Sequence, residues 1–356
     1  MTICNPSYNT NNFNQFDHQK NSNIFFVLLQ SVCKKVLIFI FSYFIGYSSS
    51  SFALLEPIKI NPPKNQLQES ANSQLQNLAM NNNKSSAKPP LIFDLPVTYN
   101  KSVQAWIQYF QSTGKKNFKV WLERSHRYIN PIKAELEQRN MPLDLAYMAM
   151  IESGFSPFAV STASAVGPWQ FIKATAQRYG LVITPWIDER KDYSKSTVAA
   201  IRYMSDLYKQ FGSWYLVAAS YNMGEYGLNR IIERNQIRDF WLLCKMNLIP
   251  EETQQYVPKL VAAMIIAKSP ALYGFRDLDI RNPLPTEVIW VPGGTNINEL
   301  ADFLGITRDY IKELNPSIIK AYIPDHIRSY AINIPKGARY LVSQFLSHRQ
   351  EILFVD

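Results

Sequence analysis

The stretch 91–275 constrains the fold most, because apolar residues recur along it at helical spacing and no alternating strand-like run of any length interrupts them. Pro142 lies near the start of one such segment, and Gly154 and Gly212 follow the ends of two others, as is typical of helix boundaries. The expected helices are 103–110, 118–128, 132–138, 143–151, 197–211, 214–219 and 256–267. The pattern predicts a mainly α fold with a helical domain over 91–280.

A different pattern follows the Pro- and Asn-containing residues 282–285. Short strand-like runs at 288–291 and 330–335 enclose two helical patterns, 297–304 and 308–314. This order predicts a small βααβ module over 286–337. The residues after it, 338–356, have helical spacing and are expected to form a C-terminal helical tail.

Residues 1–53 have the features of a secretory signal peptide. A basic pair precedes an uncharged apolar run at 36–47, a run of serines and a small-x-small site that ends at Ala53. The alternative is an uncleaved anchor that attaches the chain to a membrane, because no charge appears until Glu56 and the run can just span a bilayer. Both interpretations predict export, to the periplasm or cell envelope.

Residues 54–90 are rich in Pro, Asn, Gln, Ser and Lys and offer few apolar side chains for a core. They are expected to form a flexible linker. Three cysteines are too few for a disulfide framework. Stability must therefore come from packing.

The chain carries 37 Lys and Arg against 28 Asp and Glu, a net charge of +9, which favours an anionic partner. Export and the absence of a concentrated basic stripe argue against nucleic acid as that partner. A metal enzyme is disfavoured as well, because the four histidines are scattered without ligand spacing.

Glu152 is the candidate general acid. It shares one helix face with Leu145, Met148 and Ala149, so its carboxyl group is expected on the apolar side of a helix, near the C-terminal end that Gly154 marks. Burial and the negative end of the helix dipole both raise the pKa of such a carboxyl group, as acid catalysis near neutral pH requires. The alternative is that Glu152 lies at a helix edge or pairs with a buried arginine.

The segment 164–171 combines small residues with aromatic and amide side chains. Its Gly and Pro residues shape a turn that lets a ligand approach the backbone. Trp169 or Phe171 is placed to stack on a sugar, and Gln170 to hydrogen-bond its substituents. The alternative is that these residues only cap a core.

Two further segments carry polar aromatic and amide groups at helix ends. Tyr221 and Asn222 lie at the end of one predicted helix, and Tyr256 lies near the start of another. Taken singly each is a weak signal, because Tyr and Asn at helix ends usually satisfy backbone groups.

Together, in this order, the four segments resemble the soluble lytic transglycosylase (SLT) domain, and most of all its membrane-bound lytic murein transglycosylase D subfamily. The likeness spans roughly 94–275. Pro168-Trp169 departs from the Leu-Met of many relatives and Met223 replaces a small residue, which is expected to alter the shape of the cleft. The matching text is Ile151-Glu-Ser-Gly-Phe, Ala165-Val-Gly-Pro-Trp-Gln-Phe, Ser220-Tyr-Asn-Met-Gly and Tyr256-Val-Pro-Lys, with Trp186-Ile-Asp-Glu-Arg190 and Ser196-Thr-Val-Ala-Ala200 as further support.

This resemblance implies a lysozyme-like helical catalytic domain that cleaves the β-1,4 bond between N-acetylmuramic acid and N-acetylglucosamine. The glutamate matched by Glu152 protonates the glycosidic oxygen and then acts as base toward the muramic acid 6-hydroxyl, which leaves a 1,6-anhydro end. Peptidoglycan glycan strands are the implied partner, with no cofactor and no metal. The substrate-binding positions carried over from the family are Ser153, Gln170, Tyr221, Asn222 and Tyr256.

The module at 286–337 resembles a LysM domain. It is a degenerate copy, because the usual Gly-Asp-Thr is Gly293-Gly294-Thr295 here. The resemblance implies a tethered peptidoglycan-binding unit that raises the local concentration of enzyme at the wall. Its other matching residues are Leu300-Ala301, Leu314-Asn-Pro316 and Ile334-Pro335.

Two other functions remain open at this point. One is hydrolysis with a second carboxylate, as ordinary glycosidases use, but each candidate lies in a polar stretch that predicts a solvated or salt-bridged group. The other is a non-catalytic wall-binding protein. The presence of the acid Glu152 together with Gln170, Tyr221 and Tyr256 argues against it. The candidate second carboxylates are Asp188, Glu189, Asp192 and Glu225.

Overall fold

The computed structural model describes residues 92–353. The predicted leader at 1–53 and the predicted linker at 54–90 lie outside the described residues. Within 92–353, no helix is both long and apolar enough to cross a membrane.

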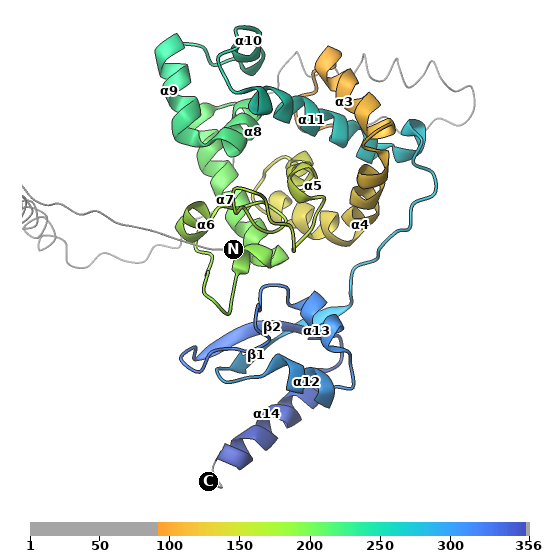
Figure 1. Cartoon of the computed structure of the whole chain (residues 1–356), viewed down its shortest axis with the longest axis vertical. Coiled ribbons are helices and arrows are strands. Elements are labelled where there is room, and N and C mark those ends of the chain that lie inside the picture. Colours follow the sequence, from red (N-terminus) through yellow and green to blue (C-terminus); the bar gives the residue numbers. More distant parts are fainter. Residues whose placement is uncertain (1–91, 354–356) are drawn as a thin grey trace, which may run out of the picture. The chain divides into compact units, whose positions relative to one another are not determined.

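The first part of the described chain is helical, and the prediction of a mainly α fold is confirmed (Figure 1). Its only extended pairings within the described range are isolated bridges. The helices are α3 (Lys101–Gln111), α4 (Lys115–Glu137), α5 (Ala146–Ser153), α6 (Lys173–Arg178), α7 (Tyr193–Phe211), α8 (Trp214–Met223), α9 (Glu225–Asn235), α10 (Phe240–Lys245) and α11 (Glu251–Lys268).

The short helix α5 lies inside the core. Every residue from 146 to 151 is buried, and α5 contacts α4 and α11. In Figure 1 the longer helices surround it. A helix that is apolar all round belongs in an interior, so the single apolar face expected from spacing understates how enclosed α5 is. The helix that carries Glu152 is therefore fixed on all sides.

The structure differs from the expected helices in two ways: two expected helices form one, and three further helices are present. The segments expected at 118–128 and 132–138 form one helix, α4, which continues through Pro131. Proline costs one backbone hydrogen bond there, but buried Ile132 and Leu136 beyond it keep the helix on the core. The helices α6, α9 and α10 were not predicted. Two of them, α6 and α10, have only six residues each, too few for a helical spacing to stand out.

The second part of the described chain confirms the predicted strand–helix–helix–strand order. Strands β1 (Thr286–Pro292) and β2 (Ser329–Pro335) pair antiparallel, with Ile289 opposite Ile332. Helices α12 (Ile297–Phe303) and α13 (Arg308–Leu314) lie between them in sequence, and α14 (Arg339–Leu353) follows.

This βααβ module is not a free unit on a tether, contrary to the expectation from sequence. Ile187, from the segment between α6 and α7, is fully buried in the apolar core of the module. Arg127 of α4 also pairs with Glu313 of α13 at 2.5 Å. The module is packed against the helical part of the chain.

Candidate active site

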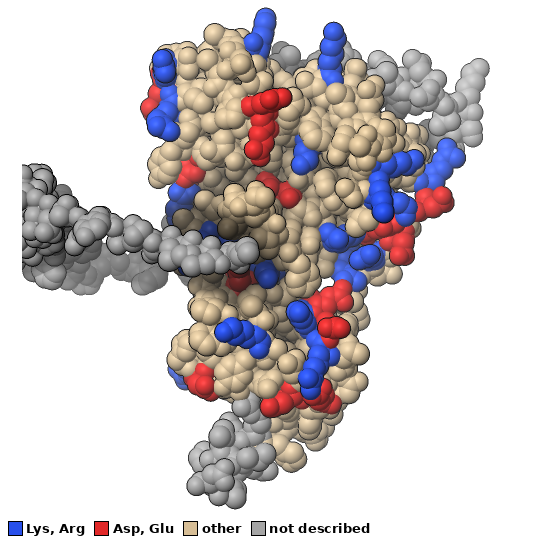
Figure 2. Space-filling model, viewed as in Figure 1, with Lys and Arg blue, Asp and Glu red and all other residues tan. Residues whose placement is uncertain are grey.

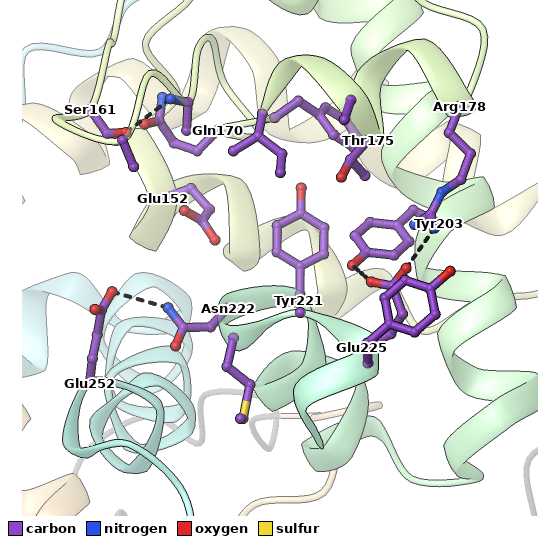
Figure 3. Close-up of a pocket in the computed structure, with 18 residues that line it drawn as sticks. Glu152, Ser161, Gln170, Thr175, Arg178, Tyr203, Tyr221, Asn222, Glu225 and Glu252 are labelled. Carbon is purple, nitrogen blue, oxygen red and sulfur yellow. Dashed lines mark hydrogen bonds and ion pairs between the residues drawn. The ribbon is translucent and has the colours of Figure 1, made fainter. Parts of the chain in front are cut away.

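A cleft of about 630 Å³ opens beside the C-terminal end of α5 (Figure 3). Helices α5, α6, α8 and α11 and the segment 161–172 contribute its walls. In Figure 3 the carboxyl group of Glu152 and the ring of Tyr221 project into the same space. The lining residues are Glu152, Ser161, Ala163, Ala165, Gln170, Phe171, Ile172, Ala174, Thr175, Arg178, Tyr203, Tyr221, Asn222, Met223, Gly224, Glu225, Tyr226 and Glu252.

Glu152 occupies the last turn of α5, and its side chain is half-buried at the cleft wall. The hydroxyl of Tyr256 donates a hydrogen bond of 2.6 Å to its Oε1 atom. Burial raises the pKa of Glu152 to about 7, and the negative charge of Glu252 adds to this effect. The hydrogen bond from Tyr256 and the positive charge of Lys259 act in the opposite direction. Glu152 is therefore a carboxyl group that can both give and take a proton near neutral pH.

The end of α5 is held by two cations through backbone carbonyls. Lys259 Nζ donates to Ile151 O at 2.9 Å, and Arg124 Nη1 donates to Gly154 O at 2.8 Å. Such cations satisfy the free carbonyls of a helix C-terminus. Arg124 thus binds the backbone beyond Glu152, and the Glu152 carboxyl group accepts its hydrogen bond from Tyr256 rather than from an arginine.

Gln170 lies on the cleft wall in a left-handed backbone conformation, with φ of 47°. Its Nε2 atom donates to Gly167 O at 2.8 Å. The expectation that Trp169 stacks on a sugar is wrong, because its ring is 0% exposed and its indole N–H donates to Thr197 Oγ1 at 3.0 Å. Phe171 is buried as well, although it is among the residues that line the cleft.

Tyr221 and Asn222 reach the cleft from the last turn of α8. Tyr221 donates to Trp169 O at 2.7 Å, so it joins α8 to the segment that carries Gln170. Asn222 donates to Glu252 Oε1 at 3.2 Å and accepts from Thr253 Oγ1 at 2.8 Å. These bonds fix the amide on the wall opposite the segment of Gln170, as Figure 3 shows.

Two of the predicted substrate-binding residues do not line the cleft. Tyr256 is buried behind Glu152 and contacts its carboxyl group. Ser153 donates to Pro168 O at 2.9 Å and accepts from the amide of Ser156 at 3.0 Å. Both hold the neighbourhood of the acid in place.

The candidate second carboxylates are all engaged. Asp188 and Glu189 are 8% and 5% exposed, and each is paired with a cation, so of the two expectations they meet the salt-bridged one. Asp192 caps α7 through the amide of Lys195. Glu225 is the one of the four that lines the cleft.

Glu225 accepts from Arg178 at 2.6 Å and from the hydroxyl of Tyr203 at 2.8 Å. Burial opposes ionisation of Glu225, but these hydrogen bonds outweigh it, and the pKa is lowered from its ordinary value. Glu225 is therefore an ionised carboxylate with both oxygens occupied.

Sequence reasoning missed several lining residues, among them Thr175, Arg178 and Glu252. A signal was present for Glu252, which precedes Tyr256 by one helical turn and so shares its face of α11. Met223, noted as a departure from the family pattern, lines the cleft beside Asn222.

Basic and acidic side chains are interspersed on the face drawn in Figure 2. Across 92–353, no group of three or more His, Cys, Asp or Glu side chains is arranged to hold a metal ion.

In comparison with known protein families, residues 129–244 match the Transglycosylase SLT domain. The chain is 36% identical over 200 residues to membrane-bound lytic murein transglycosylase D of Escherichia coli (strain K12), a match that covers 55% of this chain and 43% of that protein. The same values hold for its counterpart in Escherichia coli O6:H1. The chain thus spans less than half the length of these relatives.

Among solved structures, the 70 kDa soluble lytic transglycosylase SLT70 of Escherichia coli is 22% identical with a TM-score of 0.37, over 48% of this chain and 28% of that one. An inactive mutant of the lytic transglycosylase Slt from Pseudomonas aeruginosa is 17% identical with a TM-score of 0.34, over 42% and 25%.

Proposed function

We propose that this chain, whose residues 129–244 match the Transglycosylase SLT domain, is a lytic transglycosylase that cleaves the glycan strands of peptidoglycan. The bond cut is the β-1,4 bond between N-acetylmuramic acid and N-acetylglucosamine. The observation that carries the proposal is a single sheltered carboxyl group, Glu152, on the wall of a cleft and hydrogen-bonded to Tyr256.

In the first step Glu152 acts as a general acid. Its pKa of about 7 keeps a large fraction protonated at neutral pH. The proton passes to the glycosidic oxygen as the bond from that oxygen to C1 of the muramic acid breaks. Tyr256 holds Oε1, and Oε2 accepts no hydrogen bond from the described residues, so Oε2 is the atom free to face substrate.

In the second step the Glu152 carboxylate acts as a base. It takes the proton of the muramic acid 6-hydroxyl while O6 forms a bond to C1. The product carries a 1,6-anhydro ring, no water is consumed, and Glu152 regains its proton. One residue serves both steps because its pKa lies near the working pH.

The state of Glu225 favours this route over hydrolysis. Glu225 is held by Arg178 and Tyr203, and Glu252 by Asn222. A retaining or inverting hydrolase needs a second carboxylate that is free to attack C1 or to activate a water. Glu225 has both oxygens occupied and is not free for this role, whereas Glu252 is exposed and accepts from Asn222 at Oε1.

The remaining parts of the proposal concern substrate contacts and location. Gln170, Tyr221 and Asn222 bind the sugars on either side of Glu152, whereas Ser153 and Tyr256 support the acid from behind. The chain acts outside the cytoplasm, in the periplasm or cell envelope, and the LysM-like module adds contacts to the same polymer.

Mass spectrometry of the muropeptides that the full chain releases from purified sacculi tests the proposal. Products with 1,6-anhydromuramic acid ends are expected. Products one water heavier would identify a hydrolase. Binding to sacculi without release would identify a wall-binding protein.

A further inference from the structure

The segment Trp186–Arg190, here called the strap, is built into the core of the βααβ module. Ile187 of the strap is 0% exposed and lies in one apolar cluster with Val291, Ile318 and Ile332. The backbones of Ile187 and Ile318 also pair as an isolated antiparallel bridge. In Figure 1 the chain between α6 and α7 runs toward the module.

Polar contacts reinforce this junction. The amide of Asp188 donates to Ser317 O at 2.8 Å, and the amide of Ile319 donates to Trp186 O at 2.7 Å. The hydroxyl of Tyr330 in β2 donates to Glu189 Oε1 at 3.1 Å. Backbone bonds of this kind hold the two segments in one register.

The last residue of the strap, Arg190, reaches the wall of the cleft. Its Nη1 atom donates to Ser164 O and to Phe171 O, both at 3.2 Å. Asp188 fixes the guanidinium through Nε at 2.9 Å and Nη2 at 2.7 Å. Arg190 and Asp188 are both nearly buried, so this pair lies inside the protein and is little screened by solvent.

The backbones are in close contact at this point as well. A Cβ atom on Gly167 would lie 1.9 Å from Arg190 O, so only glycine permits the approach. The cleft segment held in this way contains Gln170, whose φ of 47° is costly for a residue with a side chain. Such a conformation persists only where its surroundings enforce it.

We infer that the βααβ module braces the catalytic cleft: it fixes the strap, and the strap, through Arg190, fixes the cleft segment 161–171 that presents Gln170. Arg190 is then a positioning residue, and the module supports catalysis on glycan too short to reach it. The inference rests on the proposed function only for its kinetic readout.

Hydrogen exchange on the full chain measures the brace without reference to activity. Ile187→Asp and Ile318→Asp place a charge in the junction from opposite sides, and a buried unpaired charge is tolerated only if the junction opens. The amides of Asp188 and Ile319 report that opening directly, because each donates across the junction. The matched control is Val288→Asp on the outer face of β1, where Val288 is 53% exposed.

The expected result is faster exchange, by about tenfold or more, at the amides of Val166 and Phe171, which bond to each other's carbonyls within the cleft segment. Both junction variants show it and the control does not. Fast exchange at Ile319 with unchanged exchange at Val166 and Phe171 overturns the inference.

Kinetics on soluble chains of two disaccharide repeats supply the second readout. Both junction variants, and Arg190→Lys, are expected to lower kcat/KM about tenfold. Lysine keeps the charge but cannot bind Asp188 through two nitrogens while a third nitrogen donates to Ser164 O and Phe171 O. Unchanged kcat/KM in all three variants overturns the link to catalysis. If the wild-type chain is inactive, the proposed function is refuted. The hydrogen-exchange result then still tests whether the module stabilises the cleft segment.

Discussion

Tyr256 of α11 donates its phenolic proton to Glu152 of α5 across 2.6 Å, a contact between residues 104 positions apart. Burial first, and the neighbouring Glu152 second, hold the pKa of Tyr256 well above its ordinary value, so it remains a donor throughout the working range. Burial of Glu152 disfavours its charged form, whereas the Tyr256 bond favours it. The balance of these two effects leaves the pKa of Glu152 at about 7, so the group can act both as an acid and as a base.

Tyr256→Phe removes this hydrogen bond and leaves the ring. The carboxylate formed after the first proton transfer loses its stabilising donor, so kcat is expected to fall roughly 10- to 100-fold. The rate of release of anhydromuropeptides measures it. Tyr208→Phe, on a ring stacked against Trp214 away from the cleft, is the control and keeps wild-type activity. Equal losses in both variants would contradict a specific role for Tyr256.

Glu152→Gln is expected to lower activity by about 10³-fold or more while the fold is retained, because the amide can neither give nor take the proton. Its effect on stability depends on pH. The pKa of Glu152 is about 7 in the folded chain against an ordinary 4.5, so ionisation of Glu152 costs the folded state stability as pH rises from 4.5 to 7. The full cost, on the order of 3 kcal/mol, is present above pH 7.

Removal of the acid should therefore stabilise the protein at alkaline pH. The Tm of Glu152→Gln is expected to exceed that of the wild type at pH 8 and to match it at pH 4. Glu233→Gln, on the exposed side of α9, should shift Tm little at either pH. A Tm difference that does not depend on pH would show that Glu152 ionises as freely in the folded chain as in the unfolded one.

Lys259 offers a test of the charge balance at Glu152. Its positive charge lowers the pKa of Glu152 and its ammonium binds Ile151 O. Loss of that charge in Lys259→Met raises the pKa of Glu152, so the alkaline limb of the kcat/KM profile should move to higher pH. Above its limb each enzyme should lose activity about tenfold per pH unit. The control is Lys209→Met, which removes an exposed ion pair with Asp206 on α7 and should leave the alkaline limb where it is. An unchanged limb in Lys259→Met would contradict the proposed effect of Lys259 on the pKa of Glu152.

Local pattern was sufficient to predict the helix that carries Glu152. Apolar spacing and Gly154 placed the carboxyl group near the end of a buried helix, and α5 ends at Ser153 with Gly154 in the left-handed conformation. Tyr256 behind Glu152 could not be derived in this way, because their contact depends on how α11 packs against α5. Only the family resemblance brought the two residues together.

Trp169 and Ile187 show where local pattern fails. From sequence alone, an aromatic residue in a Gly-Pro turn is as compatible with stacking on a sugar as with burial in a core. Trp169 lies in the core, where Thr197 of α7 accepts a hydrogen bond from its indole N–H. Ile187 lies beside Asp188 and Glu189, for which solvated or salt-bridged side chains were expected, yet it is buried in a module whose residues lie about 100 or more positions further along the chain. Both outcomes depend on long-range packing that periodicity does not encode.

Gly154→Ala tests the backbone that ends α5, directly after Glu152 and Ser153. Gly154 has a φ of 59°, and a Cβ atom there would lie 2.1 Å from Trp121 Cδ1. Strain and overlap together are expected to cost about 2–4 kcal/mol of unfolding free energy. Gly180→Ala has a similar backbone angle but nothing within 4 Å, so it should cost only about 1–2 kcal/mol. Chemical denaturation gives both values.

Trp121→Ala should recover part of the unfolding free energy that Gly154→Ala loses, because it removes the side chain that the new Cβ atom overlaps. A double variant that loses the sum of the two single losses would place the cost in backbone strain alone.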